Sequence, residues 1–261
     1  IGIGEAAPLS QLSIDDLPDY KERLAQACEQ FCLTENLDSM DLQQLPSIRF
    51  GLETAQLSLK GGDILFDTPF SRGKSTIPIN GLVWMNNAES MLQEALSKAE
   101  AGFRCIKFTI GALDFDQECR MLEAFRARYN AFQIEIRLDA NGAFKADEAA
   151  KQLKELERFE VHSIEQPIAP RNWDELAKLC HTTSIPIALD EELIGLELNK
   201  NANMMLDLIK PQFLILKPNL IGGFQKCDQW IQKCQKRNIG WWATSALESN
   251  IGLNAIAQWV S

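Results

Sequence analysis

Three acidic residues at regular spacing could hold a metal ion together. Asp139, Glu165 and Asp190 each lie at or just beyond the end of a short apolar run, 26 and 25 residues apart. Three carboxylates in one cleft would repel one another and raise each other's pKa, whereas Mg²⁺ or Mn²⁺ would bind all three through oxygen. Asn141 and Glu191 lie close to the acids and are predicted to support them. One acid alone could instead cap a helix, but three in succession favour a metal site.

Two further polar positions continue the series. Thr109 precedes the first acid by 30 residues and Lys217 follows the last by 27, so five successive units end in a polar group. Lys107 shares a strand face with Thr109, because side chains alternate along a strand. Lys107 should lie about 6.6 Å deeper by strand rise. Threonine cannot act as a base near neutral pH, so general acid–base chemistry at this position needs another residue.

The elements that must position these residues alternate between strand and helix from Ile77 onward. This alternation predicts an α/β fold with a parallel sheet. No Gly-x-Gly-x-x-Gly follows the first strand, which disfavours a dinucleotide-binding sheet. Polar groups at successive strand ends favour a (β/α) barrel, whose active site lies at the carboxyl ends of the strands.

The elements of this barrel are predicted from the alternating pattern. The predicted strands are Ile77–Trp84, Cys105–Ile110, Gln133–Leu138, His162–Ile164, Ile185–Leu189, Phe213–Leu216 and Gly240–Ala243. The predicted helices are Ser90–Ala101, Phe115–Tyr129, Ala146–Phe159, Trp173–Cys180 and Phe224–Arg237.

The N-terminal part of the sequence has a different pattern. Apolar residues recur at intervals of three and four in Asp19–Gln30 and Pro46–Leu59, which predicts two helices. The stretch Gly61–Lys74 is rich in Gly, Asp and Ser and is predicted to be a linker. We therefore expect one domain over residues 1–75 and a barrel domain over residues 76–261.

Composition excludes several classes of function. The net charge of −10 argues against a nucleic-acid partner, and neither a membrane-spanning run nor a secretory signal is visible. The seven cysteines include no Cys-x-x-Cys pair, and there are only two histidines, which disfavours zinc sites and a disulfide framework. A cytoplasmic protein with free thiols and a small-molecule substrate is expected, while the sequence gives no indication of its oligomeric state.

The ordered motifs at the strand ends resemble those of the enolase superfamily. These motifs are Asp-Ala-Asn at 139–141, Glu-Gln-Pro at 165–167, Asp-Glu at 190–191 and Leu-Lys-Pro-Asn-Leu-Ile-Gly-Gly at 216–223. The resemblance implies an enolase-type barrel with an N-terminal α+β capping domain. It also implies strands before Gly4 and an eighth barrel strand after Ser261, so we expect both ends of the chain to be incomplete and the physical protein to be longer.

Within that superfamily, the segment Gly4–Leu9 (Gly-Glu-Ala-Ala-Pro-Leu) is similar to one in the o-succinylbenzoate synthases of the muconate-lactonizing-like group. The resemblance implies metal-dependent dehydration of a small anionic cyclohexadiene carboxylate, through an enediolate, on the way to menaquinone. In such enzymes the second lysine of a Lys-x-Lys pair is the acid/base, and Thr109 stands at that position. The resemblance places Lys217 against the enediolate. Ser245 and Ser249 are candidates for shaping the substrate pocket.

Two alternatives remain open. An N-acylamino acid racemase or dipeptide epimerase would use the same metal site, but it needs two opposed lysines. A catalytically impaired protein that still binds metal and ligand would also account for Thr109. An active enzyme could instead use Lys217 as its base, and the sequence does not choose between these readings.

Overall fold

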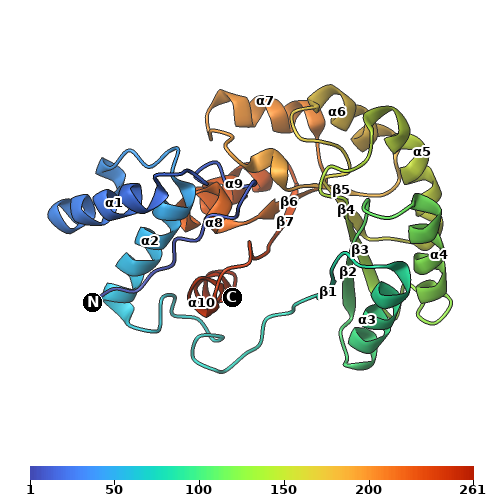
Figure 1. Ribbon diagram of the computed structural model, residues 1–261, viewed down its shortest axis with the longest axis horizontal. Coiled ribbons are helices and arrows are strands. Elements are labelled where there is room, and N and C mark those ends of the chain that lie inside the picture. Colours follow the sequence, from blue (N-terminus) through green and yellow to red (C-terminus); the bar gives the residue numbers. More distant parts are fainter. The chain divides into compact units, whose positions relative to one another are not determined.

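The chain divides into two compact units, which are described separately. The computed structural model covers residues 1–261 (Figure 1). The first unit comprises Ile1–Ile77, Leu193–Asn201 and Ile215–Ser261, and the second comprises Pro78–Glu192 and Ala202–Leu214. The predicted domains over residues 1–75 and 76–261 remain a prediction. No helix is both long and apolar enough to cross a membrane.

The second unit is built on parallel strands. Each strand pairs in parallel with the next from β1 to β6, and the sheet as a whole has the order β1-β2-β3-β4-β5-β6-β7. The strands of this unit are β1 (Gly81–Val83), β2 (Cys105–Thr109), β3 (Glu135–Asp139), β4 (Ser163–Glu165), β5 (Ile187–Leu189) and the first half of β6 (Phe213–Leu216), whereas β7 (Gly240–Ala243) belongs to the first unit. The predicted α/β class and parallel sheet are thereby confirmed.

Helices connect these strands, as the alternation predicted. They are α3 (Ala88–Glu100), α4 (Phe115–Arg126), α5 (Ala146–Leu156), α6 (Trp173–Thr182) and α7 (Lys200–Ile209), with short 3₁₀ turns η2 (Glu157–Phe159) and η3 (Glu191–Leu193). Figure 1 shows α3, α4 and α5 along one side of β1 to β4. The side chains of Asn87 and Asp114 accept backbone N–H bonds at the starts of α3 and α4, which fixes where these helices begin. On the buried face, the rings of Phe108 and Phe125 pack edge to face at 5.4 Å.

The first strand is shorter than predicted. The apolar pattern predicted a strand over Ile77–Trp84, but only Gly81–Val83 forms one. Pro78 lacks an N–H and cannot donate to a sheet, which is consistent with a later start. The helix α7 was not among the predicted helices.

The first unit contains helices from both ends of the chain. Its elements are α1 (Tyr20–Thr34), η1 (Leu37–Ser39), α2 (Pro46–Gly61), α8 (Pro218–Ile221), α9 (Phe224–Gln235), β7 and α10 (Asn250–Trp259). Helix α2 contacts both α8 and α10. Residues 1–77 form helices and turns without a strand, so the α+β capping domain remains a prediction.

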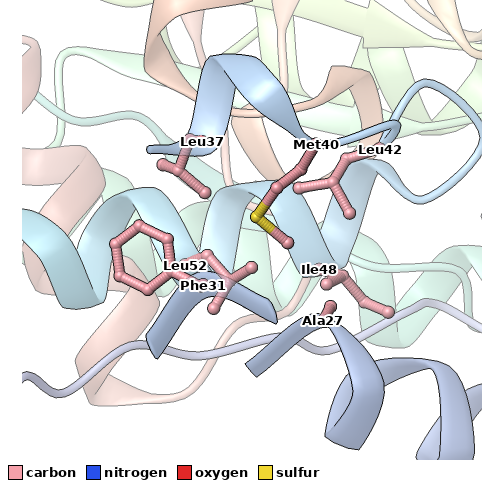
Figure 2. Packing of buried hydrophobic residues seen from close by; sticks show 7 residues of the cluster. All are labelled: Ala27, Phe31, Leu37, Met40, Leu42, Ile48 and Leu52. Atoms are coloured by element: carbon pink, nitrogen blue, oxygen red, sulfur yellow. The ribbon is translucent and has the colours of Figure 1, made fainter. Parts of the chain in front are cut away.

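An apolar cluster joins α1 to α2 (Figure 2). Its members are all at most 8% exposed, and they come from α1, from the η1 region and from α2: Ala27, Phe31, Leu37, Met40, Leu42, Ile48 and Leu52. Beside the cluster, the buried Asp15 carboxylate accepts hydrogen bonds from the backbone N–H and the hydroxyl of Ser47, at 2.9 and 2.6 Å. Burial raises the pKa of Asp15, although its bonds to Ser47 oppose the rise. Apolar packing and this buried bond together hold the start of α2.

The cluster yields a prediction about stability. Ile48 is fully buried, so Ile48→Ala should lower the free energy of unfolding by about 2–5 kcal/mol, through lost burial and a residual cavity. Urea unfolding followed by circular dichroism measures the change. Leu33→Ala on the exposed side of α1, where Leu33 is 87% exposed, should have an effect within about 0.5 kcal/mol. Equal effects for the two variants would contradict this account of the cluster.

Candidate metal centre

Parallel register brings the three acids to the same end of the sheet. Asp139 and Glu165 are the last residues of β3 and β4 and are paired in register. Glu165 is level with Ala188 of β5. Asp190 lies two residues after Ala188, and because side chains alternate along a strand, both residues belong to the same face of the sheet. All three residues are at most 5% exposed. The structure therefore gathers the predicted metal ligands at the carboxyl ends of neighbouring strands.

Lys107 reaches two of these carboxylates. Its Nζ lies 2.8 Å from Asp139 Oδ2 and 2.6 Å from Glu165 Oε2. Its backbone is level with Arg137, one strand repeat below Asp139, but its long side chain spans that distance. Burial alone would lower the pKa of Lys107, yet the charges of Glu165 and Asp139 outweigh burial and raise it. The ammonium is thus protonated at neutral pH and cannot accept a proton in this arrangement.

The surroundings of Glu165 contain too little positive charge to stabilise its ionised carboxylate. The pKa of Glu165 is raised to about 8, mainly by burial and also by the charges of Asp139 and Asp190, while Lys107 partly opposes the rise. Its Oε1 is buried and has no hydrogen-bond partner. A buried acceptor without a partner is costly, and a cation would satisfy it.

The donor set fits a hard divalent cation. Carboxylate oxygens are what Mg²⁺ and Mn²⁺ bind, and the unpartnered Glu165 oxygen is available as a ligand. However, no three acidic, histidine or cysteine side chains converge on one point in the geometry of an occupied metal site. The Lys107 ammonium instead pairs with Asp139 and Glu165.

Of the two predicted supporting residues, Asn141 contacts the first carboxylate, and Glu191 contacts Asn141. The backbone N–H of Asn141 donates to Asp139 Oδ1 at 3.1 Å, and its side-chain amide donates to Glu191 Oε1 at 3.0 Å. Asn141 has a φ of 44°, in the left-handed region that asparagine tolerates better than most residues. This conformation turns the backbone N–H back toward the carboxylate.

A network that sequence reasoning missed ties the ends of β4 and β5 together. Gln166 Oε1 accepts from the backbone N–H groups of Asp190 and Glu192, both at 3.3 Å. Its amide nitrogen donates to the carbonyl oxygen of Ile168 at 3.0 Å. Gln166 is fully buried and directly follows Glu165. A buried glutamine one residue after a ligand was the available signal, and this glutamine fixes Asp190 relative to Glu165.

Glu192 completes that network from the other strand end. Its buried carboxylate accepts from the backbone N–H of Arg171 at 3.0 Å and from the indole N–H of Trp173 at 2.6 Å. The Arg171 guanidinium donates to the Glu192 carbonyl oxygen at 2.7 Å. The loop after β4 is therefore held against the loop after β5, and the carboxylate of Glu192 is fully engaged in this role.

The remaining predicted residues fall in two places. Thr109 is buried at the end of β2 and level with Asp139. Lys217, Ser245 and Ser249 belong to the first unit. Lys217 is half-buried at the start of α8, and Ser245 is exposed. The position of these three relative to the carboxylates remains a prediction.

Ser249 has a structural partner in the Gly4–Leu9 segment. Its backbone N–H and its hydroxyl both donate to the carboxylate of Glu5 at 2.6 Å, and the Gly252 N–H donates to that carboxylate at 2.7 Å. Burial acts to raise the pKa of Glu5, but these bonds outweigh it and lower the pKa. The carboxylate thereby caps the start of α10. A Cβ on Gly4 would lie 1.9 Å from the Gly51 carbonyl oxygen, which explains the glycine in this segment.

Comparison with known proteins agrees with this arrangement. The family model described as enolase C-terminal domain-like matches residues 90–261. The chain is 46% identical to the o-succinylbenzoate synthase of Desulfotalea psychrophila, over 94% of this chain and 66% of that protein. It therefore spans slightly less than two thirds of the length of that relative.

Solved structures share the fold. The crystal structure of MenC from Desulfotalea psychrophila LSv54 has a TM-score of 0.86 and 40% identity, and the match covers 99% of this chain and 81% of that one. The o-succinylbenzoate synthase of Thermosynechococcus elongatus BP-1 has a TM-score of 0.78 at 24% identity, covering 98% and 76%. At that identity the second likeness shows the fold alone.

The centre predicts how one ligand contributes to metal binding. Glu165→Gln removes an anionic oxygen donor, so Mg²⁺ affinity measured by isothermal titration calorimetry should fall by at least about 10-fold. Glu148→Gln removes the same charge from the exposed surface of α5 and should leave the affinity unchanged. Equal affinities for Glu165→Gln and the unmodified protein would remove Glu165 from the site.

The Gln166 network predicts a positioning effect. Gln166→Met keeps the approximate shape but leaves two N–H groups and a carbonyl without partners, so Mg²⁺ affinity should fall by about 10-fold. Ile187→Val in β5 serves as the control, because it should cost about 0.5–1.5 kcal/mol of stability without altering metal binding. If the two variants bind Mg²⁺ equally well, Gln166 has only a structural role.

Proposed function

The chain belongs to the enolase C-terminal domain-like family, and from this premise we propose that it acts as an o-succinylbenzoate synthase. This carbon–oxygen lyase dehydrates a cyclohexadiene carboxylate to o-succinylbenzoate, through an enediolate, on the way to menaquinone. The observation that carries the proposal is the burial of three carboxylates at one end of a parallel sheet. The 46% identity to a synthase over 94% of the chain supports this reaction above others in the family.

Asp139, Glu165 and Asp190 would hold Mg²⁺, with Mn²⁺ as the alternative. The related synthase from Thermosynechococcus elongatus was solved with Mg in its active site, and the all-oxygen donor set of this chain supports the same choice. A divalent cation bound there supplies positive charge against the negative charge that develops on an enediolate. The chain itself contributes the placement of the ligands, through Gln166 and Asn141.

Lys107 would hold charge rather than transfer protons. Its ammonium is paired with Asp139 and Glu165, and its pKa is raised by them after the opposing effect of burial. A base must have lost its proton to act, so this pairing disfavours Lys107 as the base. We infer that Lys107 orients the two carboxylates and limits their mutual repulsion.

The threonine at residue 109 leaves two candidate accounts of proton transfer. Thr109 is buried at the position where resembling synthases carry a lysine, and a hydroxyl cannot take a proton from carbon at neutral pH. Either Lys217 acts as the base, or the chain binds metal and ligand with impaired turnover. A racemase or epimerase is disfavoured, because it needs a base on each face of its substrate.

A substitution at residue 109 tests this proposal. Thr109→Lys in the full-length protein should raise turnover of the cyclohexadiene substrate by about 10²–10⁴-fold, the usual contribution of a general acid–base group. Thr109→Met supplies similar bulk without an amine and should give no gain. Steady-state assays at saturating Mg²⁺ measure all three proteins.

The other outcomes are also informative. If the threonine form already turns over at an ordinary enzymatic rate and the lysine adds nothing, the base lies elsewhere and Lys217→Ala becomes the next variant. If no form turns over the substrate although Mg²⁺ binds, the synthase proposal is wrong.

A further inference from the structure

The first unit contains a cavity that the proposed reaction does not use. It has a volume of about 400 Å³ and lies among the start of α2, the segment before it, the loop over residues 193–199, and helices α8 and α9. This volume falls in the range of small-molecule sites. None of its lining residues is among the predicted catalytic or metal-binding residues.

One part of the cavity wall is apolar. Ile14, Leu193, Leu196, Leu220 and Ile221 line it, and Leu193, Leu220 and Ile221 are at most 8% exposed. Apolar walls of this kind accept hydrocarbon or aromatic groups, because burial removes apolar surface from water.

Two cations line the same cavity. Lys226, in the first turn of α9, is half-buried and makes no hydrogen bond or salt bridge. Burial lowers the pKa of Lys226, the charge of Arg49 lowers it further, and Glu197 only partly opposes them. One terminal nitrogen of Arg49 donates to Asp38 at 3.3 Å and to the side-chain oxygen of Gln225, while the Nε is buried without a partner. Both cations therefore have unused donors.

The acidic residues of the lining do not satisfy these donors. The two carboxylate oxygens of Glu197 accept bonds from the side-chain amides of Gln43 and Asn199. Asp41 is exposed to solvent. Glu197 only partly offsets the cost of withdrawing the Lys226 ammonium from water, and an anion entering the cavity would reduce that cost further.

We propose that this cavity is a binding site for a small organic anion with an apolar body. The anionic group, a carboxylate or a phosphate monoester, lies against the ammonium of Lys226 and the exposed part of the Arg49 side chain, and the apolar body lies against the leucine and isoleucine wall. The site goes beyond the proposed synthase activity and does not depend on it.

Isothermal titration calorimetry tests the site with two probes, phenyl phosphate and 3-phenylpropionate. Neutral 3-phenylpropanol is the uncharged control. The protein is kept in EDTA, so that a divalent cation in the second unit cannot contribute to binding. Saturable one-to-one binding is expected for at least one anion, with the alcohol at least about 10-fold weaker, because a bond to a charged group is lost. The stronger of the two anions identifies the preferred anionic group.

Matched variants assign the binding to this cavity. Lys226→Met keeps the length of the side chain but removes the charge, and it should weaken anion binding by about 10-fold or more. Lys236→Met removes an exposed lysine at the end of the same helix and should have no effect. Leu196→Trp fills the apolar side and should weaken binding while both cations remain, which keeps the test decisive if Lys226→Met does not fold.

Three results would overturn the proposal: absence of saturable binding by both anions, equal binding by Lys226→Met and the unmodified protein, or an equal loss in Lys236→Met. Failure of the synthase assay would not affect it, because no turnover or metal enters this measurement.

Discussion

The pairing of one buried ammonium with two buried carboxylates is the interaction on which the second unit depends. Lys107 lies within 2.8 Å of both Asp139 and Glu165. Removing one partner from a buried ion pair leaves an uncompensated charge and typically costs about 3–5 kcal/mol. The pairing therefore constrains β2, β3 and β4 to one register, and the same register puts the three acids at one end of the sheet.

The protein keeps its cluster of negative charge by holding the backbone around it. Asn141 and Gln166 both have left-handed backbone conformations, with φ of 44° and 34°, and each lies one or two residues after a carboxylate. Such conformations are uncommon outside glycine and need support from their surroundings. Here the hydrogen bonds of the two side chains to Glu191, Ile168 and the turn after β5 provide that support. The strained backbone and the mutually repelling carboxylates therefore lie at the same end of the sheet.

In the first unit, carboxylates serve a different purpose. Glu5 caps α10, and Glu53 accepts the first backbone N–H groups of α9, from Phe224 and Gln225. A Cβ on Gly223 would lie 2.0 Å from Glu53 Oε2, so a glycine is needed for this approach. Each acid joins segments 171 to 247 residues apart. Because helix starts attract negative charge, the N-terminal residues of the chain and its last two helices form one structure.

The sequence by itself determined the α/β class, the parallel strands from β2 to β6 and the placement of one acid at each of three strand ends. These features depend on local periodicity and on the fixed direction of parallel strands, which a single chain displays directly. Only the tertiary structure decided that the Lys107 ammonium lies beside the Asp139 and Glu165 carboxylates, that Gln166 bridges two strand ends and that Ser249 is hydrogen-bonded to Glu5. It also decided which two cations line the cavity, and that α7 and α10 form. These outcomes depend on which distant side chains come into contact, and contact between residues far apart in the chain is set by packing, which no local pattern records.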